Sequence, residues 1–132
     1  MEIALAIILI FAFLFAFVVF IKYKKGKQFS SNDNRFIKNH WEMVENEPNL
    51  KQAVIEADKL LDFALGKKGL QGNLGEKLKN AQGYFTDINS VWAAHKLRNR
   101  IAHEMNIKIY DNEAKRALKQ FKQGLKDLGV KF

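Results

Sequence analysis

One stretch of the chain, Trp92–Glu104, concentrates the side chains that are most capable of chemistry. Its apolar residues recur at the spacing of an α-helix, in which successive side chains step by about 100° around the axis. On such a helix His95, Arg98, Asn99 and His103 fall within one arc beside the apolar face. A helix that needs only solubility usually carries glutamate–lysine pairs in such an arc. Imidazole, guanidinium and amide groups in their place make this arc a candidate site.

Arg98, Asn99 and His103 form the candidate catalytic set. The Arg98 guanidinium can bind a phosphate through a planar pair of N–H donors and stays charged at any working pH. His103 can accept or donate a proton near neutral pH, and Asn99, one helical turn earlier, can orient its ring or bind a phosphate oxygen. These groups suit metal-free cleavage of RNA, because the 2′-hydroxyl of the substrate is the nucleophile and the protein only moves protons and stabilises charge. DNA lacks that hydroxyl, so this route excludes it.

A purely structural interpretation of the same side chains stays open. His103 can stabilise the C-terminal end of its own helix, where a positive charge is favoured. The two arginines of the stretch can form salt bridges instead of binding a ligand. The carboxylates that this interpretation offers them are Glu56, Asp58 and Glu104. Glu56, at the edge of an apolar stripe on an earlier helix, is the partner that we expect for Arg98 if the arginine is structural.

The segment Arg98–His103, RNRIAH, resembles the signature of the HEPN superfamily, which is an arginine, a polar residue, a short spacer and a histidine. The setting is similar too, since the motif lies late in a helix and one more amphipathic helix follows it. The resemblance covers residues 49–128. It implies a helical bundle that forms a homodimer through its motif helices, so that two copies of the arginine and histidine share one cleft.

The same resemblance implies an activity and an alternative to it. Active members of the superfamily are metal-independent ribonucleases, many of them in toxin–antitoxin or antiviral systems, and Arg98, Asn99 and His103 match their motif. Other HEPN-like domains bind nucleotides or protein partners without cutting. RNA binding or RNA cleavage is therefore the leading hypothesis. A non-catalytic module at the cytoplasmic face of the membrane, with an unidentified protein partner, is the alternative.

Further basic side chains could extend an RNA-binding surface. His95 and Arg100 lie beside the motif but have no counterpart in it. The last helix carries lysines along one face, a lysine stripe that could follow an RNA backbone. This lysine stripe comprises Lys115, Lys119, Lys122 and Lys126. A solvated helix face explains it as well.

Cysteine and histidine usage argues against a metal site. The chain has no cysteine, so disulfides and cysteine–metal sites are excluded. Its three histidines include no pair at a helical metal-ligand spacing. We therefore expect neither a metal nor another cofactor.

Residues 3–21 are an unbroken apolar run without charge, glycine or proline. As a helix they span about 28 Å, close to the ~30 Å hydrocarbon core of a bilayer. A cleaved signal peptide, the competing interpretation, would need a positive leader, a shorter apolar core and a small-residue cleavage site. Met1 and Glu2 supply no basic side chain, and lysines follow the run directly. We therefore expect residues 1–21 to be a single-pass transmembrane anchor.

Residues 22–39 are expected to be a basic, flexible juxtamembrane linker. They hold six basic residues and one acidic residue, so this segment carries +5 of the net charge of +8. Positive charge on the C-terminal side of the anchor predicts that the N-terminus lies outside the cell membrane and the C-terminal domain lies in the cytoplasm.

Residues 40–132 are expected to form the HEPN-like domain, and their pattern is helical. The expected elements are a short helix at 35–46, a long helix at 49–65, a glycine-broken loop at 66–85 with a helical turn at 74–79, a helix ending at His103, and a last helix from Asp111 to Gly129. No strand alternation appears. The predicted fold is therefore all-α, a transmembrane helix followed by a small antiparallel bundle whose marginal core a homodimer would complete.

Overall fold

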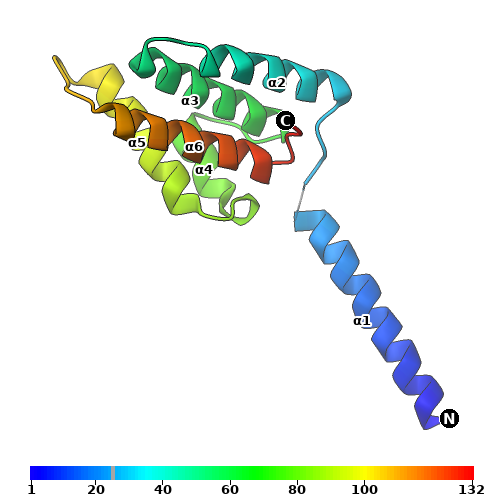
Figure 1. Ribbon diagram of the computed structural model, residues 1–132. Coiled ribbons are helices and arrows are strands. Elements are labelled where there is room, and N and C mark those ends of the chain that lie inside the picture. Colours follow the sequence, from blue (N-terminus) through cyan, green and yellow to red (C-terminus); the bar gives the residue numbers. More distant parts are fainter. Residues whose placement is uncertain (25) are drawn as a thin grey trace.

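The computed structural model describes residues 1–24 and 26–132, and within these residues the chain is all-α, as predicted, without a strand. Along the described residues, six α-helices and one short 3-10 helix follow each other (Figure 1). Their bounds are α1 Glu2–Lys24, α2 Ser31–Glu45, α3 Leu50–Lys67, α4 Leu74–Asn80, η1 Gln82–Tyr84, α5 Ile88–His103 and α6 Asp111–Asp127. Helices α2 to α6 form a bundle from which α1 leads away.

Among the described residues, α1 is the one helix that is long and apolar enough to cross a membrane. All its side chains up to Ile21 are exposed, and none belongs to the core of the bundle. Its 23 residues correspond to a length of about 34 Å, comparable with the ~30 Å hydrocarbon core. This helix is compatible with a membrane anchor or a signal sequence, and the side of the membrane on which the bundle lies stays a prediction.

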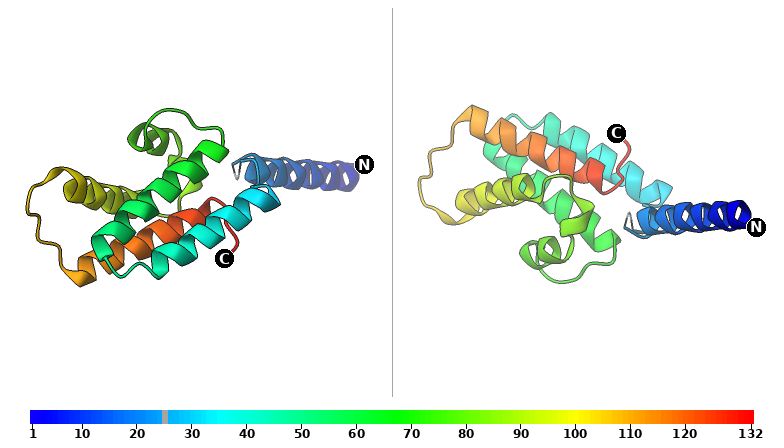
Figure 2. Two further views of the ribbon diagram at one scale, coloured as in Figure 1. Left: turned by 90° about the horizontal axis from the view of Figure 1, so that it is seen from above. Right: turned by 90° about the horizontal axis from the view of Figure 1, so that it is seen from below.

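Helix α3 is the centre of the bundle, because α2, α4, α5 and α6 all pack against it (Figure 2). The Asn49 side chain caps its start by accepting a hydrogen bond from the Gln52 N–H group. The apolar stripe expected from the sequence faces the core, with Leu61 and Leu65 fully buried. One acidic residue, Asp58, is buried with them.

Helix α2 begins inside the segment that the sequence analysis assigned to a flexible linker. The Ser30 hydroxyl oxygen accepts a hydrogen bond from the Asp33 N–H group at 3.0 Å, which is an N-cap that starts the helix. Ile37, one turn further, is fully buried in the core. The prediction of a linker over residues 22–39 is therefore wrong for residues 22–24, which belong to α1, and for residues 31–39, which belong to α2.

The end of α2 is joined to α6 through Glu45. The Glu45 carboxylate accepts hydrogen bonds from Lys122 Nζ at 2.7 Å and from Trp41 Nε1 at 2.8 Å. The hydrogen bond from Lys122, followed by that from Trp41, lowers the pKa of Glu45 below its ordinary value of 4.5. A carboxyl group with a lowered pKa stabilises the fold above its unfolded pKa, and this contribution is lost as the pH falls through the folded pKa.

The Glu45→Gln variant should therefore lose stability at neutral pH and lose less on acidification. We expect the wild-type free energy of unfolding to fall towards that of Glu45→Gln as the pH decreases below 4.5. Urea unfolding of residues 28–132, measured from pH 7 to pH 3 by tryptophan fluorescence, tests this. The exposed Glu42, which forms no ion pair in the described part of the chain, provides the control variant Glu42→Gln. If the free energies of unfolding of wild type and Glu45→Gln differed by the same amount at every pH, the prediction would be contradicted.

Candidate functional site

Four polar side chains from α3 and α5 form a closed ring, which we call the Asp58 cluster: Asp58, His95, Arg98 and Asn99. Asp58 Oδ1 lies 2.7 Å from His95 Nδ1, and Asp58 Oδ2 lies 3.3 Å from Arg98 Nε. Arg98 Nη1 donates a hydrogen bond of 3.0 Å to Asn99 Oδ1, and Asn99 Nδ2 lies 3.3 Å from His95 Nε2. Each member therefore contacts two others.

The Asn99 amide determines which nitrogen of the His95 imidazole accepts a hydrogen bond. Its oxygen accepts a hydrogen bond from Arg98, so its –NH2 group is the end that faces His95 Nε2. An –NH2 group only donates, so Nε2 must accept and carry no proton. The His95 proton then lies on Nδ1, from which it is donated to Asp58. His95 is therefore held from both sides of its imidazole, by Asp58 at Nδ1 and by Asn99 at Nε2.

The side chains of the Asp58 cluster differ in how deeply they are buried. The side chains of Asp58 and His95 are 5% and 11% exposed, whereas that of Arg98 is 28% exposed. Since both ring nitrogens of His95 have protein partners, we assign His95 a structural role in place of the RNA contact expected from the sequence. Trp92 packs edge-on against its ring, with 5.9 Å between the ring centroids.

Arg98 is held in place by Asp58 and Asn99, but part of its guanidinium has no hydrogen-bond partner among the described residues. Its buried Nε lies at ion-pair distance from Asp58 but forms no well-directed hydrogen bond, and its Nη1 is bonded to Asn99. Nη2 forms no hydrogen bond to any residue that the structure describes, and the side chain is partly exposed. The arginine can therefore offer a fixed positive charge to an anion in solvent. The partner is Asp58, whereas Glu56, the partner we expected, bonds instead to Gln52 and Lys59.

His103 is the last residue of α5, and its side chain is exposed. It forms no hydrogen bond or ion pair with any residue in the described part of the chain. Arg100, also exposed, pairs with Glu104 at 3.7 Å and with Glu113 at 3.0 Å. The charge of Arg100 is thus compensated by Glu104, which the structural interpretation of the sequence named, and by Glu113 of α6, which it did not.

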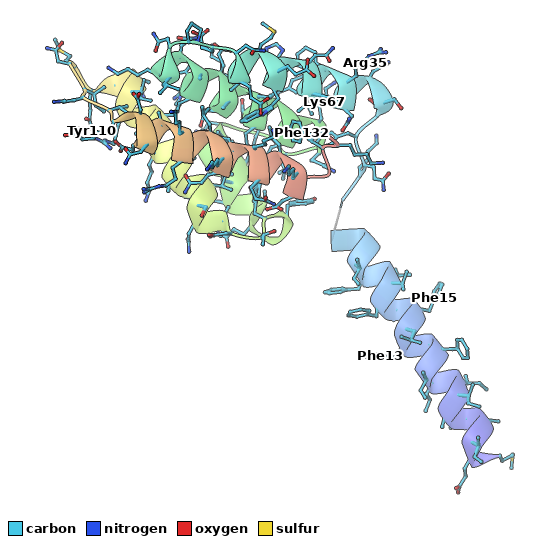
Figure 3. All side chains as sticks on the ribbon, viewed as in Figure 1. Phe13, Phe15, Arg35, Lys67, Tyr110 and Phe132 are labelled. Atoms are coloured by element: carbon cyan, nitrogen blue, oxygen red, sulfur yellow. The ribbon has the colours of Figure 1, made fainter. Side chains whose placement is uncertain are left out.

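Arg98 and His103 diverge within one copy of the chain. Five residues apart on a helix, they point about 140° apart around its axis. The structure therefore brings Arg98 together with Asn99 and does not bring His103 to either of them through a contact. The α5–α6 connection after His103 lies at the end of the bundle opposite α1, as the position of Tyr110 shows (Figure 3).

The lysine stripe on α6 is mostly exposed, but its members have different surroundings. Lys115, Lys119 and Lys126 are exposed. Lys122 is half-buried, because it pairs with Glu45 and its ammonium lies over the rings of Trp41 and Phe132. Lys122 is therefore part of the fold, and the other three remain available to a ligand.

Comparison of the chain with protein-family models, with curated proteins and with solved structures finds no match. Among the described residues, no group of three histidine, cysteine, aspartate or glutamate side chains gathers as a possible metal site.

Proposed function

We propose that this protein is a single-pass membrane protein whose cytoplasmic bundle is HEPN-like and binds RNA, which it cleaves without a metal. The observation that supports this proposal best is the pair of basic groups on the last turns of α5. One is Arg98, fixed by Asp58 and Asn99 yet partly exposed. The other is the exposed His103, which has no partner among the described residues. A fixed arginine can hold a phosphate and an unengaged histidine can move a proton.

The proposed reaction uses the substrate's own nucleophile. The RNA 2′-oxygen forms a bond to phosphorus while the bond from phosphorus to the 5′-oxygen breaks. A base takes the 2′-hydroxyl proton and an acid gives a proton to the departing 5′-oxygen, so that a 2′,3′-cyclic phosphate and a free 5′-hydroxyl result. His103 acts in proton transfer, Arg98 stabilises the charge on the phosphorane, and Asn99 positions Arg98 through its amide oxygen.

A homodimer completes this proposed site. Arg98 and His103 point about 140° apart on α5, and a second copy that pairs along α5 would bring a second arginine and a second histidine to the shared cleft. Two histidines would then be available, one as base and one as acid. The exposed Lys115 and Lys119 supply sequence-independent contacts to the RNA backbone.

Cleavage tests this function directly. The full chain in detergent is incubated with single-stranded RNA and excess EDTA, and the product ends are analysed. We expect 2′,3′-cyclic phosphates and at least a 100-fold lower rate for His103→Ala. His40→Ala, which removes a half-buried imidazole on α2, is the matched control and should retain the rate. Absence of cleavage by the folded, dimeric wild type would reject the ribonuclease proposal.

Arg98 needs a variant that keeps its structural contact. Arg98→Ala would leave Asp58 buried and unpaired, so a loss of activity could reflect unfolding. Arg98→Lys keeps the positive charge beside Asp58 but lacks the planar guanidinium that binds phosphate with two N–H donors. We expect Arg98→Lys to remain folded by tryptophan fluorescence while cleavage decreases.

The alternative function is a non-catalytic interaction module at the membrane surface. It is favoured by one observation: Arg98 already has a buried carboxylate partner, as a structural arginine would. Under this alternative, His103→Ala leaves RNA binding and every measured reaction unchanged, and the same homodimer presents its surface to a protein partner.

The membrane anchor is a separate part of the proposal. It rests on α1, which is apolar, fully exposed up to Ile21 and outside the core of the bundle. Alkaline extraction of membranes that contain the full chain tests it. An integral anchor keeps the protein in the membrane pellet, whereas release into the supernatant would reject the anchor without bearing on the ribonuclease.

A further inference from the structure

A hollow of about 810 Å³ lies at the end of the bundle where α2 begins and where α3 and α6 end. The chain leaves this end towards α1 (Figure 1). The labelled side chains of Arg35 and Phe132 mark the same end in Figure 3. Gln28 and Phe29, from the short connection between α1 and α2, form part of its wall.

The lining of this hollow is strongly basic. Its five cationic side chains are those of Arg35, Lys38, Lys68, Lys126 and Lys131, and its acidic side chains are those of Glu42 and Asp127. Five positive and two negative side chains give the lining a net charge of +3. A concave surface with a net positive charge attracts an anion.

Internal salt bridges do not neutralise this charge. Within the described part of the chain, none of the five cations forms an ion pair. One of the two carboxylates is already engaged, since Asp127 accepts hydrogen bonds from the Thr86 N–H and hydroxyl groups and from Gln123. The positive charge of the hollow is therefore available to a ligand.

The walls of the hollow are held by specific contacts. The Asn34 amide and the Lys131 backbone exchange two hydrogen bonds, of 2.9 and 3.1 Å, which fix the end of the chain against α2. Gly129 has a φ of +102°, which permits the turn that brings this end across the hollow. The Lys68 ammonium donates to the Lys27 carbonyl oxygen and lies 4.3 Å from the centre of the Phe29 ring. Burial lowers the pKa of Lys68, so a bound anion would compensate for water that this ammonium has lost.

The hollow is close to the end of α1 for a reason of chain length alone. Phe29 follows Lys24, the last residue of α1, by five residues. Five residues span at most about 18 Å, however the connection is arranged. The hydrocarbon core ends near the last apolar residue of α1, and the headgroup layer extends several ångströms beyond it. A wall of the hollow therefore lies within reach of the lipid headgroups whenever α1 spans a bilayer.

We infer that this hollow binds the phosphate of an anionic phospholipid from the bilayer that holds α1. This inference rests on the membrane anchor of the proposed function but not on RNA cleavage. The net positive lining selects an anionic lipid over a zwitterionic one, because the choline of a zwitterionic headgroup would bring a further positive charge beside the lysines. The bound lipid would hold the bundle with one end against the membrane and the candidate site at the other end.

The test measures thermal unfolding of the full chain in nanodiscs. One set contains phosphatidylcholine only, and the other contains phosphatidylcholine with phosphatidylglycerol. Both tryptophans lie in the bundle, on α2 and α5, so tryptophan fluorescence reports unfolding of the bundle without α1. A ligand that binds only the folded state raises the unfolding midpoint. We expect phosphatidylglycerol to raise it by about 5 °C.

Two variants with equal charge loss separate the hollow from general attraction to the membrane. In the double variant Lys38→Gln, Lys126→Gln two of the three exposed lysines are removed from the lining, and the shift should vanish. In Lys79→Gln, Lys96→Gln two exposed lysines are removed elsewhere on the bundle, and the shift should remain. Equal reduction of the shift by both double variants, or no shift in the wild type, would overturn the inference.

Inorganic phosphate distinguishes a lipid headgroup from free phosphate as the source of the bound anion. It is added to the protein in phosphatidylcholine nanodiscs and should raise the midpoint little at millimolar concentration. A full shift with free phosphate and none with phosphatidylglycerol would assign the hollow to a soluble anion and overturn the lipid. Alkaline extraction, done first, shows whether the anchor itself fails. A protein retained in the membrane but unaffected by phosphatidylglycerol therefore refutes the hollow alone.

Discussion

Replacing Asp58 by alanine is expected to lower the free energy of unfolding of the bundle by about 3 kcal/mol. Asp58 is 5% exposed and holds both His95 and Arg98. Its removal leaves a buried ring N–H and a partly buried guanidinium without their acceptor. The expected loss is at the lower end for a buried pair, because Arg98 is 28% exposed and regains some hydration.

A matched variant two residues away on α3 provides the control. Glu56 pairs with Lys59 at the surface, with side-chain exposures of 32% and 60%. Exposed pairs of this kind contribute about 1 kcal/mol or less. Urea unfolding of residues 28–132, followed by tryptophan fluorescence, gives both values. Asp58→Asn should lose nearly as much as Asp58→Ala, because its amide presents N–H donors to Arg98. Equal losses for Asp58→Ala and Glu56→Ala would show that the Asp58 cluster does not stabilise the fold.

The second large effect is expected at Phe121, a fully buried side chain in the middle of α6. Phe121→Ala should lower the free energy of unfolding by about 3–5 kcal/mol, since it removes buried apolar surface and leaves a cavity where α6 packs on α3. The same urea experiment measures it.

Phe36→Ala on α2 is the control for Phe121→Ala. Phe36 is 45% exposed and packs on the rings of Phe63 and His40, with 4.7 and 4.9 Å between the ring centroids. Phe36→Ala should lower the free energy of unfolding by about 1 kcal/mol. If the two phenylalanine variants lost the same free energy, α6 would not be docked on α3 as the structure describes.

Most of the helical elements could be predicted because their signals are local. The apolar stripe of α3, the Asp111 start of α6 and the glycine-rich stretch before α5 all depend on residues a few positions apart. The start of α2 was missed for the same reason. Ser30 is typical both of a flexible segment and of an N-cap, and only burial of Ile37 decides for the helix.

The Asp58 cluster could be predicted only in part. The crowding of His95, Arg98 and Asn99 on one arc follows from helical spacing, and their partner was among the carboxylates considered. The choice of Asp58 over Glu56 depends on how α3 is rotated against α5, and residues 37 positions apart in the sequence carry no local signal of that rotation. A signal was present, because Asp58 follows Val54 by four residues and precedes Leu61 by three, a spacing usual for core positions. An acidic residue at such a position indicates a buried partner.

The two hydrogen bonds between Asn34 and Lys131 have a practical consequence for attachments to the protein. They hold the last residues of the chain at the end of the bundle that leads to α1 (Figure 1). A reporter fused after Phe132 would therefore stand beside the basic hollow and far from His103, and under the proposed membrane anchor it would face the membrane surface. Such a fusion suits measurements of RNA cleavage, whereas studies of lipid binding need the C-terminus left unmodified.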